Sequence, residues 1–152
     1  MPVISAPIDP ASDEAIAAAL ADDRALLLVD GQCMLCSRGA GFVMRVDRNR
    51  RLRIGTGQSA IGRALYERYG EDEDETILLV AGERAFTKSA GVIEALRRIG
   101  RGWRWLGWLA ALAPERWRDA GYDWLARNRF RLFGRRTSCL MPTQEQRDRF
   151  VT

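Results

Sequence analysis

The sequence contains no histidine, and Lys88 is the only lysine among its 24 basic residues. Without histidine, Ser-His and Cys-His catalytic pairs are excluded, and so are most catalytic zinc sites. Proline is absent between Pro10 and Pro114. No apolar run approaches the roughly 18 residues that a membrane-spanning helix needs. We interpret the excess of arginine as a compositional bias of the genome, with an anion-binding surface as the alternative.

Cysteine is also scarce, with three residues in a chain of 152. The segment Met1 to Pro10 has no basic region followed by an apolar one, so we expect no secretory signal and a cytoplasmic location. Cysteines in that compartment are more often reactive or metal-binding than structural disulfides. The length suits one domain with a real core, and 47% apolar and 29% charged residues are typical of a globular protein.

The stretch from Leu26 to Cys36 organises the chain. Leu26 to Val29 is an apolar run that ends at an Asp-Gly turn, which predicts a buried strand. The segment Ser37 to Asp47 predicts a helix packed on a sheet. Cys33 and Cys36 should therefore lie where a strand ends and a helix begins, within disulfide reach of each other. Backbone N–H groups and the helix dipole stabilise a thiolate there, so this is the geometry of a dithiol redox site.

Further elements follow along the chain in a regular order. Gly82-Glu83 predicts a tight turn between two strands, and Ser59 and Ser89 are expected to cap helices. The predicted elements are a strand at 52–54, a helix that ends at Gly70, a hairpin of 76–80 with 84–87, and a helix that buries Val92, Ile93, Leu96 and Ile99. The fold class is therefore α/β, a thioredoxin-like mixed sheet flanked by helices.

The C-terminal part differs in composition. All five tryptophans lie between Trp103 and Trp124, and nine arginines but three acidic residues lie between Arg101 and Arg136. We interpret it as a helical extension whose aromatic face covers the redox domain. Alternatives are a membrane-surface helix pair or an anion-binding face. Nucleic acid is not expected, since no binding motif is present. The predicted parts are a leader with a short helix (1–24), a thioredoxin-like CxxC domain (25–100) and a helical extension packed on it (101–152).

The stretch Asp30-Gly31-Gln32-Cys33-Met34-Leu35-Cys36 resembles the Asp-x-x-Cys-x-x-Cys motif of the DCC family of predicted thiol-disulfide oxidoreductases. The resemblance runs from about Leu27 to Phe150. It includes Gln58-Ser59, Ile77 to Val80, Thr87-Lys88-Ser89, Tyr122 to Arg129, and Phe133 to Pro142. It implies a thioredoxin-like fold and dithiol chemistry. Ordinary thioredoxins place a cis-proline beside the cysteine pair. Because this chain has no proline between Pro10 and Pro114, the loop Asp74 to Thr76 must shape the substrate groove instead.

We assign hypothetical roles around the cysteine pair. Cys33, nearest the helix start, is the attacking thiolate, and Arg38 could add a favourable charge. Cys36 is the resolving thiol that closes the disulfide and releases the substrate. Asp30 could accept or relay a thiol proton, although its charge would also raise a thiol pKa. The alternative for Asp30 is a purely structural role in the turn.

The substrate contacts are expected from side chains on both sides of the pair. The candidate groove residues are Gln32, Met34, Leu35, Glu75 and Thr76. The expected partner is a protein or a small molecule with a thiol or disulfide, and no cofactor is expected.

Cys139 is the third cysteine, and inert packing, a third redox thiol and a metal ligand all stay open for it. A closed zinc site needs four nitrogen or sulfur ligands, and the chain offers three cysteines and no histidine. A thiolate metal-binding module of Cys33, Cys36 and Cys139 is therefore an alternative to the redox function. A non-catalytic domain that docks on a membrane or a partner is another.

Overall fold

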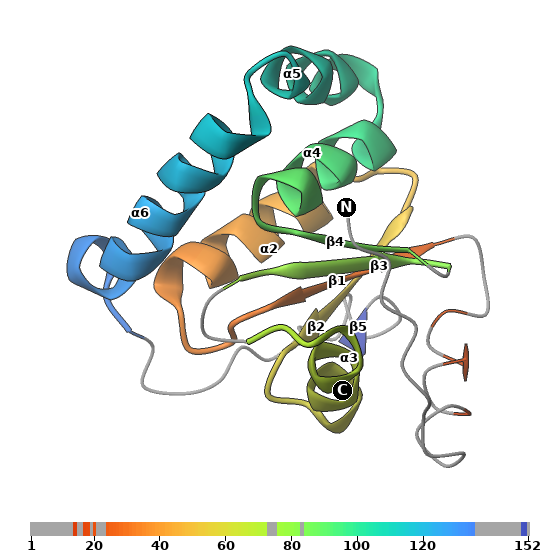
Figure 1. Cartoon of the computed structure of the whole chain (residues 1–152). Helices are drawn as coiled ribbons and strands as arrows, with labels where there is room; N and C mark the ends of the chain where they lie inside the picture. Colours follow the sequence, from red (N-terminus) through yellow and green to blue (C-terminus); the bar gives the residue numbers. More distant parts are fainter. Residues whose placement is uncertain are drawn as a thin grey trace.

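The computed structural model describes residues 24–72, 76–82, 84–135 and 150–151, with a few positions between 14 and 20. The described strands form one five-stranded sheet in the order β4-β3-β1-β2-β5 (Figure 1). Central strand β1 runs parallel to β2 and antiparallel to β3. The bounds are β1 (Ala25–Val29), β2 (Leu52–Thr56), β3 (Leu78–Ala81), β4 (Arg84–Thr87) and β5 (Phe150–Val151).

Helices cover both faces of this sheet, with α3 on one face and α2 and α4 on the other (Figure 1). The bounds are α2 (Met34–Val46), α3 (Ala60–Tyr69), α4 (Lys88–Ile99), α5 (Arg101–Ala111) and α6 (Glu115–Phe133). The predicted α/β class, with a mixed sheet flanked by helices and a tryptophan-rich helical extension, is confirmed. The arrangement of the first four strands is consistent with a thioredoxin-like fold.

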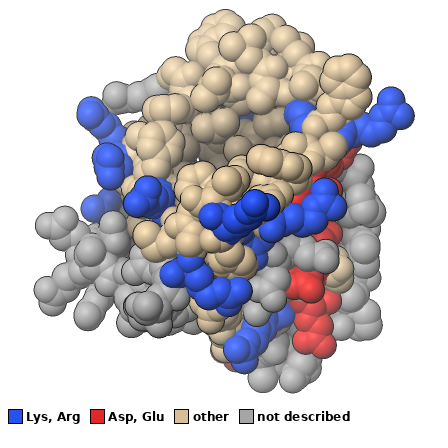
Figure 2. Space-filling view, turned by 90° about the vertical axis from the view of Figure 1, so that its left-hand side faces the viewer, with Lys and Arg blue, Asp and Glu red and all other residues tan. Residues whose placement is uncertain are grey.

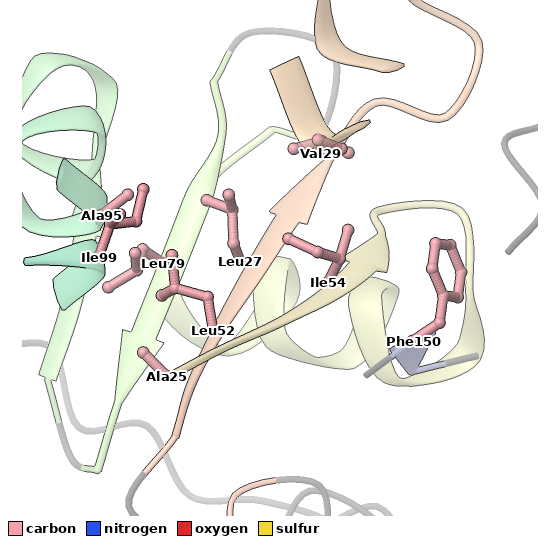
Figure 3. Packing of buried hydrophobic residues seen from close by; sticks show 10 residues of the cluster. Ala25, Leu27, Val29, Leu52, Ile54, Leu79, Ala95, Ile99 and Phe150 are labelled. Carbon is pink, nitrogen blue, oxygen red and sulfur yellow. The ribbon is translucent and has the colours of Figure 1, made fainter. Parts of the chain in front are cut away.

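The core has one apolar cluster on each face of the sheet, because successive side chains of β1 point to opposite sides. Leu26 and Leu28 pack with Leu65 of α3. Leu27 and Val29 belong to the other cluster, together with side chains from α2 and α4. Figure 3 shows this second cluster, in which Leu27 lies between Leu79 and Ile54. The first strand after the leader is thus the centre of the molecule.

Local sequence determines several helix ends. The Ser59 hydroxyl caps α3 by accepting a hydrogen bond from the Gly62 N–H at 3.0 Å, and Gly70 ends the helix with a left-handed φ of 66°. Both follow the predicted pattern. The predicted cap of α4 at Ser89 is wrong, since α4 begins at Lys88 and the Ser89 hydroxyl donates to Asp119 of α6 instead. A tertiary contact therefore takes the side chain that the local pattern assigned to capping.

The extension packs on the sheet domain, but only part of the predicted aromatic face takes part in this packing. Trp103 packs edge-on against Phe42 of α2, with ring centroids 5.0 Å apart. Trp117 and Trp124 are 72% and 58% exposed, so these two side chains face solvent. The inward side of α6 carries Arg129, which is buried. The spacing of apolar side chains along α6 was therefore not enough to predict which side of this helix is covered.

The α5 and α6 helices therefore present an exposed apolar surface. Its members are Trp105, Leu106, Trp108, Leu109, Leu112, Trp117, Trp124, Leu132 and Phe133. Figure 2 shows uncharged residues gathered at the level of α5, with arginine and lysine side chains below and beside them. Within the described residues, no helix has the length and apolar character needed to cross a bilayer.

Sequence reasoning missed β5. It adds to the sheet edge by pairing in parallel with β2, with Phe150 opposite Ile54. The C-terminal extension thus contributes a strand as well as helices. Two residues are too few for a periodic pattern to predict a strand.

Candidate active site

The cysteine pair lies at the carboxyl end of β1. After the strand, Asp30 and Gly31 form a turn, and Cys33 occupies the N-cap position of α2 with an extended backbone (φ −83°, ψ 123°). Its sulfur accepts a hydrogen bond from the Cys36 N–H at 3.3 Å. An N–H group of the first helical turn is thus aimed at the Cys33 sulfur. This contact favours negative charge on Cys33.

The two cysteines differ in exposure. Both are free thiols, but Cys33 is fully buried, whereas Cys36 is half-buried. Cys33 lies against the chain that follows α6. It forms an isolated antiparallel bridge with Arg135, and the Met34 N–H donates to the Gly134 carbonyl at 3.4 Å. The end of α6 therefore covers the start of α2.

Asp30 is held by three hydrogen bonds from three segments of the chain. One carboxylate oxygen accepts from the Gln32 N–H and from the Gln58 side-chain amide, both at 2.9 Å. The other oxygen accepts from Arg129 of α6 at 3.3 Å. Gln58 also accepts from the Gly31 N–H at 3.0 Å. The Asp30 carboxylate therefore stabilises the turn before α2 and also has a charged partner in Arg129. Its side chain is 4% exposed and lies beside the thiols.

The Cys36 thiol is strongly disposed to stay protonated. Its pKa is raised from an ordinary 9.0 to about 12, chiefly by burial and further by the adjacent Cys33 sulfur. The Arg129 guanidinium acts in the opposite direction, and Asp30 adds a smaller rise. Burial dominates because a thiolate loses more hydration than a thiol when it is removed from water. At neutral pH, Cys36 is therefore a proton-bearing thiol beside the Cys33 sulfur.

A cavity of about 340 Å³ opens beside Cys36, between the sheet and helices α2, α4 and α6. Leu27 and Val29 of β1 line its floor, and apolar side chains of the three helices line its walls. Phe42 and Val92 also line it and are about 40% exposed, so the cavity reaches the surface. Its polar groups come from Asp30, Cys36, Thr76, Tyr122 and Arg129.

Thr76 and Tyr122 fix the loop that enters β3. The Tyr122 hydroxyl accepts a hydrogen bond from the Ile77 N–H at 2.9 Å. The Thr76 hydroxyl accepts from the Lys88 N–H at 2.8 Å, and the Thr76 carbonyl accepts from the Tyr66 hydroxyl at 2.7 Å. Burial raises the pKa of Tyr122, so its hydroxyl stays protonated. No cis peptide occurs among the described residues.

The structure divides the predicted groove residues into two groups. Leu35 and Thr76 line the apolar cavity. Gln32 instead lines a polar groove of about 500 Å³. This groove shares Arg129 with the apolar cavity and is also lined by Arg63, Arg127 and Arg135. The backbone of Met34 contacts Gly134, and Glu75 lies outside the described residues.

The auxiliary residues have different outcomes. Arg38 is exposed on α2, while the guanidinium that acts on Cys36 belongs to Arg129. Cys139 lies outside the described residues, so its role stays a prediction. In the described part of the chain, no three histidine, cysteine, aspartate or glutamate side chains are grouped to hold a metal ion.

Sequence reasoning assigned no role to Arg129, Gln58 or Tyr122, which complete the site. Asp30 and Arg129 are 99 positions apart, so no local pattern links them. All three belong to stretches included in the family resemblance, and that resemblance was the available indication of their importance.

Comparisons with known proteins identify the family of this chain. The family model of DCC1-like thiol-disulfide oxidoreductases matches residues 27–135. A chloroplastic DCC family protein of Arabidopsis thaliana is 37% identical over 78% of this chain and 70% of its own length. The uncharacterized protein YuxK of Bacillus subtilis is 29% identical over 83% of this chain and 93% of its own.

No solved structure matches the chain. The family match begins within β1 and ends at Arg135, so it includes both cysteines, Asp30, Gln58 and Arg129. This chain therefore belongs to the DCC1-like family of thiol-disulfide oxidoreductases.

Proposed function

We propose that the oxidoreductase works through a reversible disulfide between Cys33 and Cys36. The observation that carries the proposal is the hydrogen bond from the Cys36 N–H to the Cys33 sulfur at the start of α2. Residues at positions i and i+3 of a helix start lie within disulfide reach. The expected substrates are thiols and disulfides, as the family implies.

Cys33 is the attacking thiolate in this proposal, and Cys36 is the resolving thiol. The N-cap position and the Cys36 N–H support charge on Cys33. The pKa of Cys36, near 12, supports a protonated partner. Cys33 is fully buried, so attack on a protein disulfide requires Gly134 and Arg135 to move away from it. Cys36 then displaces the substrate from the mixed disulfide.

Asp30 and Arg129 are positioning residues in the proposal. Arg129 holds the Asp30 carboxylate, and the fixed pair sets the charge around Cys36. Asp30 is also a candidate acceptor for the proton that Cys36 releases as it attacks. Because Arg129 comes from α6, the helical extension takes part in the redox site.

A redox titration tests the proposed couple. Protein equilibrated in graded thiol and disulfide buffers would be alkylated and read by intact mass. We expect one reversible two-electron step that is lost in Cys33→Ser and in Cys36→Ser. Cys139→Ser serves as the matched control and should keep the step. A pair that resists oxidation, or that oxidises only after a chelator is added, would overturn the proposal.

A second interaction is proposed for the exposed apolar surface of α5 and α6. Exposed tryptophan and leucine beside arginine suit peripheral contact with an anionic membrane or a protein. Flotation with anionic liposomes tests this, and replacement of both Cys33 and Cys36 should leave flotation unchanged. Nucleic acid is not an expected partner. A cytoplasmic location is also part of the proposal, and cell fractionation tests it.

A further inference from the structure

The cavity beside Cys36 has the properties of a binding site. It lies between β1, α2, α4 and α6, and most of its lining is aliphatic or aromatic. Its floor reaches the buried side chains Leu27 and Val29, so it extends into the domain. Concave apolar pockets with a few polar groups at one place are typical of small-molecule sites. The depth favours a small molecule over a peptide segment.

Arg129 adds an independent observation at the polar side of the cavity. Its side chain is 8% exposed, and Nη1 and Nη2 donate to Ala126 and Asp30. Its Nε is buried and has no hydrogen-bond partner. A buried donor without a partner is costly, so an acceptor that reached this N–H would be stabilising. Arg129 lines the cavity together with Cys36.

The accessible sulfur at this cavity is that of Cys36, because Cys36 lines the cavity while Cys33 is fully buried. If the pair is oxidised, a ligand in the cavity therefore meets the Cys36 side of the disulfide. Attack there expels Cys33, whose sulfur accepts the Cys36 N–H. The sulfur that better supports negative charge is the better leaving group in thiol-disulfide exchange.

We infer that this cavity binds a small apolar thiol, whose sulfur lies at Cys36 and Arg129, as a substrate of the oxidised pair. The substrate thiolate attacks the Cys36 sulfur, the Cys33–Cys36 bond breaks, and Cys33 leaves as a thiolate. A second substrate thiolate attacks the substrate sulfur of the mixed disulfide and releases Cys36. The two protons that the substrate thiols have lost end on Cys33 and Cys36, so both cysteines end as thiols. Two thiols are thereby oxidised to one disulfide as the pair accepts two electrons. This inference rests on the proposed Cys33–Cys36 couple.

The test measures how fast different thiols reduce the oxidised protein. The probes are 2-phenylethanethiol as the apolar thiol, 2-mercaptoethanol as the neutral polar thiol, and 3-mercaptopropionate as the anionic thiol. Each rate is divided by the rate of the same thiol with a small unstructured disulfide. We expect an advantage of at least about tenfold for 2-phenylethanethiol, since burial of a phenyl-sized group contributes at least that much.

Two glycines of α2 supply a matched pair of variants. Gly39 lines the cavity and Gly41 does not, and an added Cβ meets no atom within 4 Å at either position. Gly39→Leu should abolish the advantage of 2-phenylethanethiol, and Gly41→Leu should keep it. Val92→Phe narrows the mouth from α4 and should act as Gly39→Leu does.

The outcomes separate this inference from the proposed couple. If the pair cannot be oxidised, both are overturned. If the pair oxidises but all three thiols react alike, the cavity assignment alone is overturned. A preference for the anionic 3-mercaptopropionate would also overturn the cavity assignment, because it would place the substrate in the arginine-lined groove instead. Equal loss of rate for all thiols in Gly39→Leu would mean that the leucine blocks Cys36 rather than the cavity.

Discussion

Among the described residues, two ion pairs attach α6 to the rest of the molecule, and they differ mainly in burial. Arg129 and Asp30 are 3.3 Å apart with side chains 8% and 4% exposed. Lys88 and Asp123 are 3.1 Å apart with side chains 34% and 38% exposed. The first pair lies beside the cysteines, and the second lies where α4 begins. Similar distances therefore have different consequences, because water screens the second pair and not the first.

The buried pair should show the largest effect when one partner is removed. Arg129→Met leaves the Asp30 carboxylate buried beside Cys36 without its cationic partner. We expect a loss of about 3–5 kcal/mol in the free energy of unfolding, measured by urea denaturation. The double variant Asp30→Asn with Arg129→Met should recover part of that loss, because no uncompensated charge remains. A loss below about 1 kcal/mol in Arg129→Met would contradict this picture.

Near the buried pair, Cys36 should make the free energy of unfolding depend on alkaline pH. Its pKa is raised from 9.0 to about 12 in the folded protein, so the unfolded chain loses this proton first. The stabilising contribution is complete below pH 9.0 and is lost as the pH rises through about 12. Cys36→Ser should flatten this part of the curve of unfolding free energy against pH. The same slope in Cys36→Ser and wild type would exclude Cys36 as its source.

An intermediate effect is expected for Ser89, which joins α4 to α6 through Asp119. Its hydroxyl and its N–H both donate to the Asp119 carboxylate. Ser89→Ala removes the hydroxyl bond and keeps the N–H bond, so we expect a loss of about 1–2 kcal/mol by urea denaturation. Asp119→Asn is the companion variant. An unchanged stability in Ser89→Ala would mean that this contact does not hold α6.

The exposed pair should show the smallest effect. Lys88→Met removes the charge that pairs with Asp123 at the surface. We expect a loss of about 0.2–1 kcal/mol, which decreases further as salt is added. The comparison fails if Lys88→Met costs as much stability as Arg129→Met.

The part of the site made from consecutive residues could be predicted from the sequence. The apolar run before Asp30 and the spacing of Cys33 and Cys36 place the pair at a strand end and a helix start. Hydrophobic burial and N-capping act over a few residues, so their patterns are visible locally. The α/β class follows from the succession of such elements along the chain.

The part made by α6 could not be predicted in the same way. Arg129 reaches Asp30 from a distant segment, and only the packed structure brings them together. The tryptophan-rich face of the extension was predicted to cover the redox domain, yet Trp117 and Trp124 face solvent. Periodicity identifies an apolar side of a helix, but the packing of the neighbouring helices decides whether that side is covered.

The bridge between Cys33 and Arg135 has a consequence for the newly made chain. A ribosome adds about 5–20 residues per second, so Arg135 follows Cys33 by roughly 5–20 seconds. During that interval Cys33 has been made, but Gly134 and Arg135, which cover it, have not. Its thiol then lacks the cover that Gly134 and Arg135 give it in the finished fold. During synthesis, oxidants and other thiols can therefore reach Cys33 without any movement of that segment.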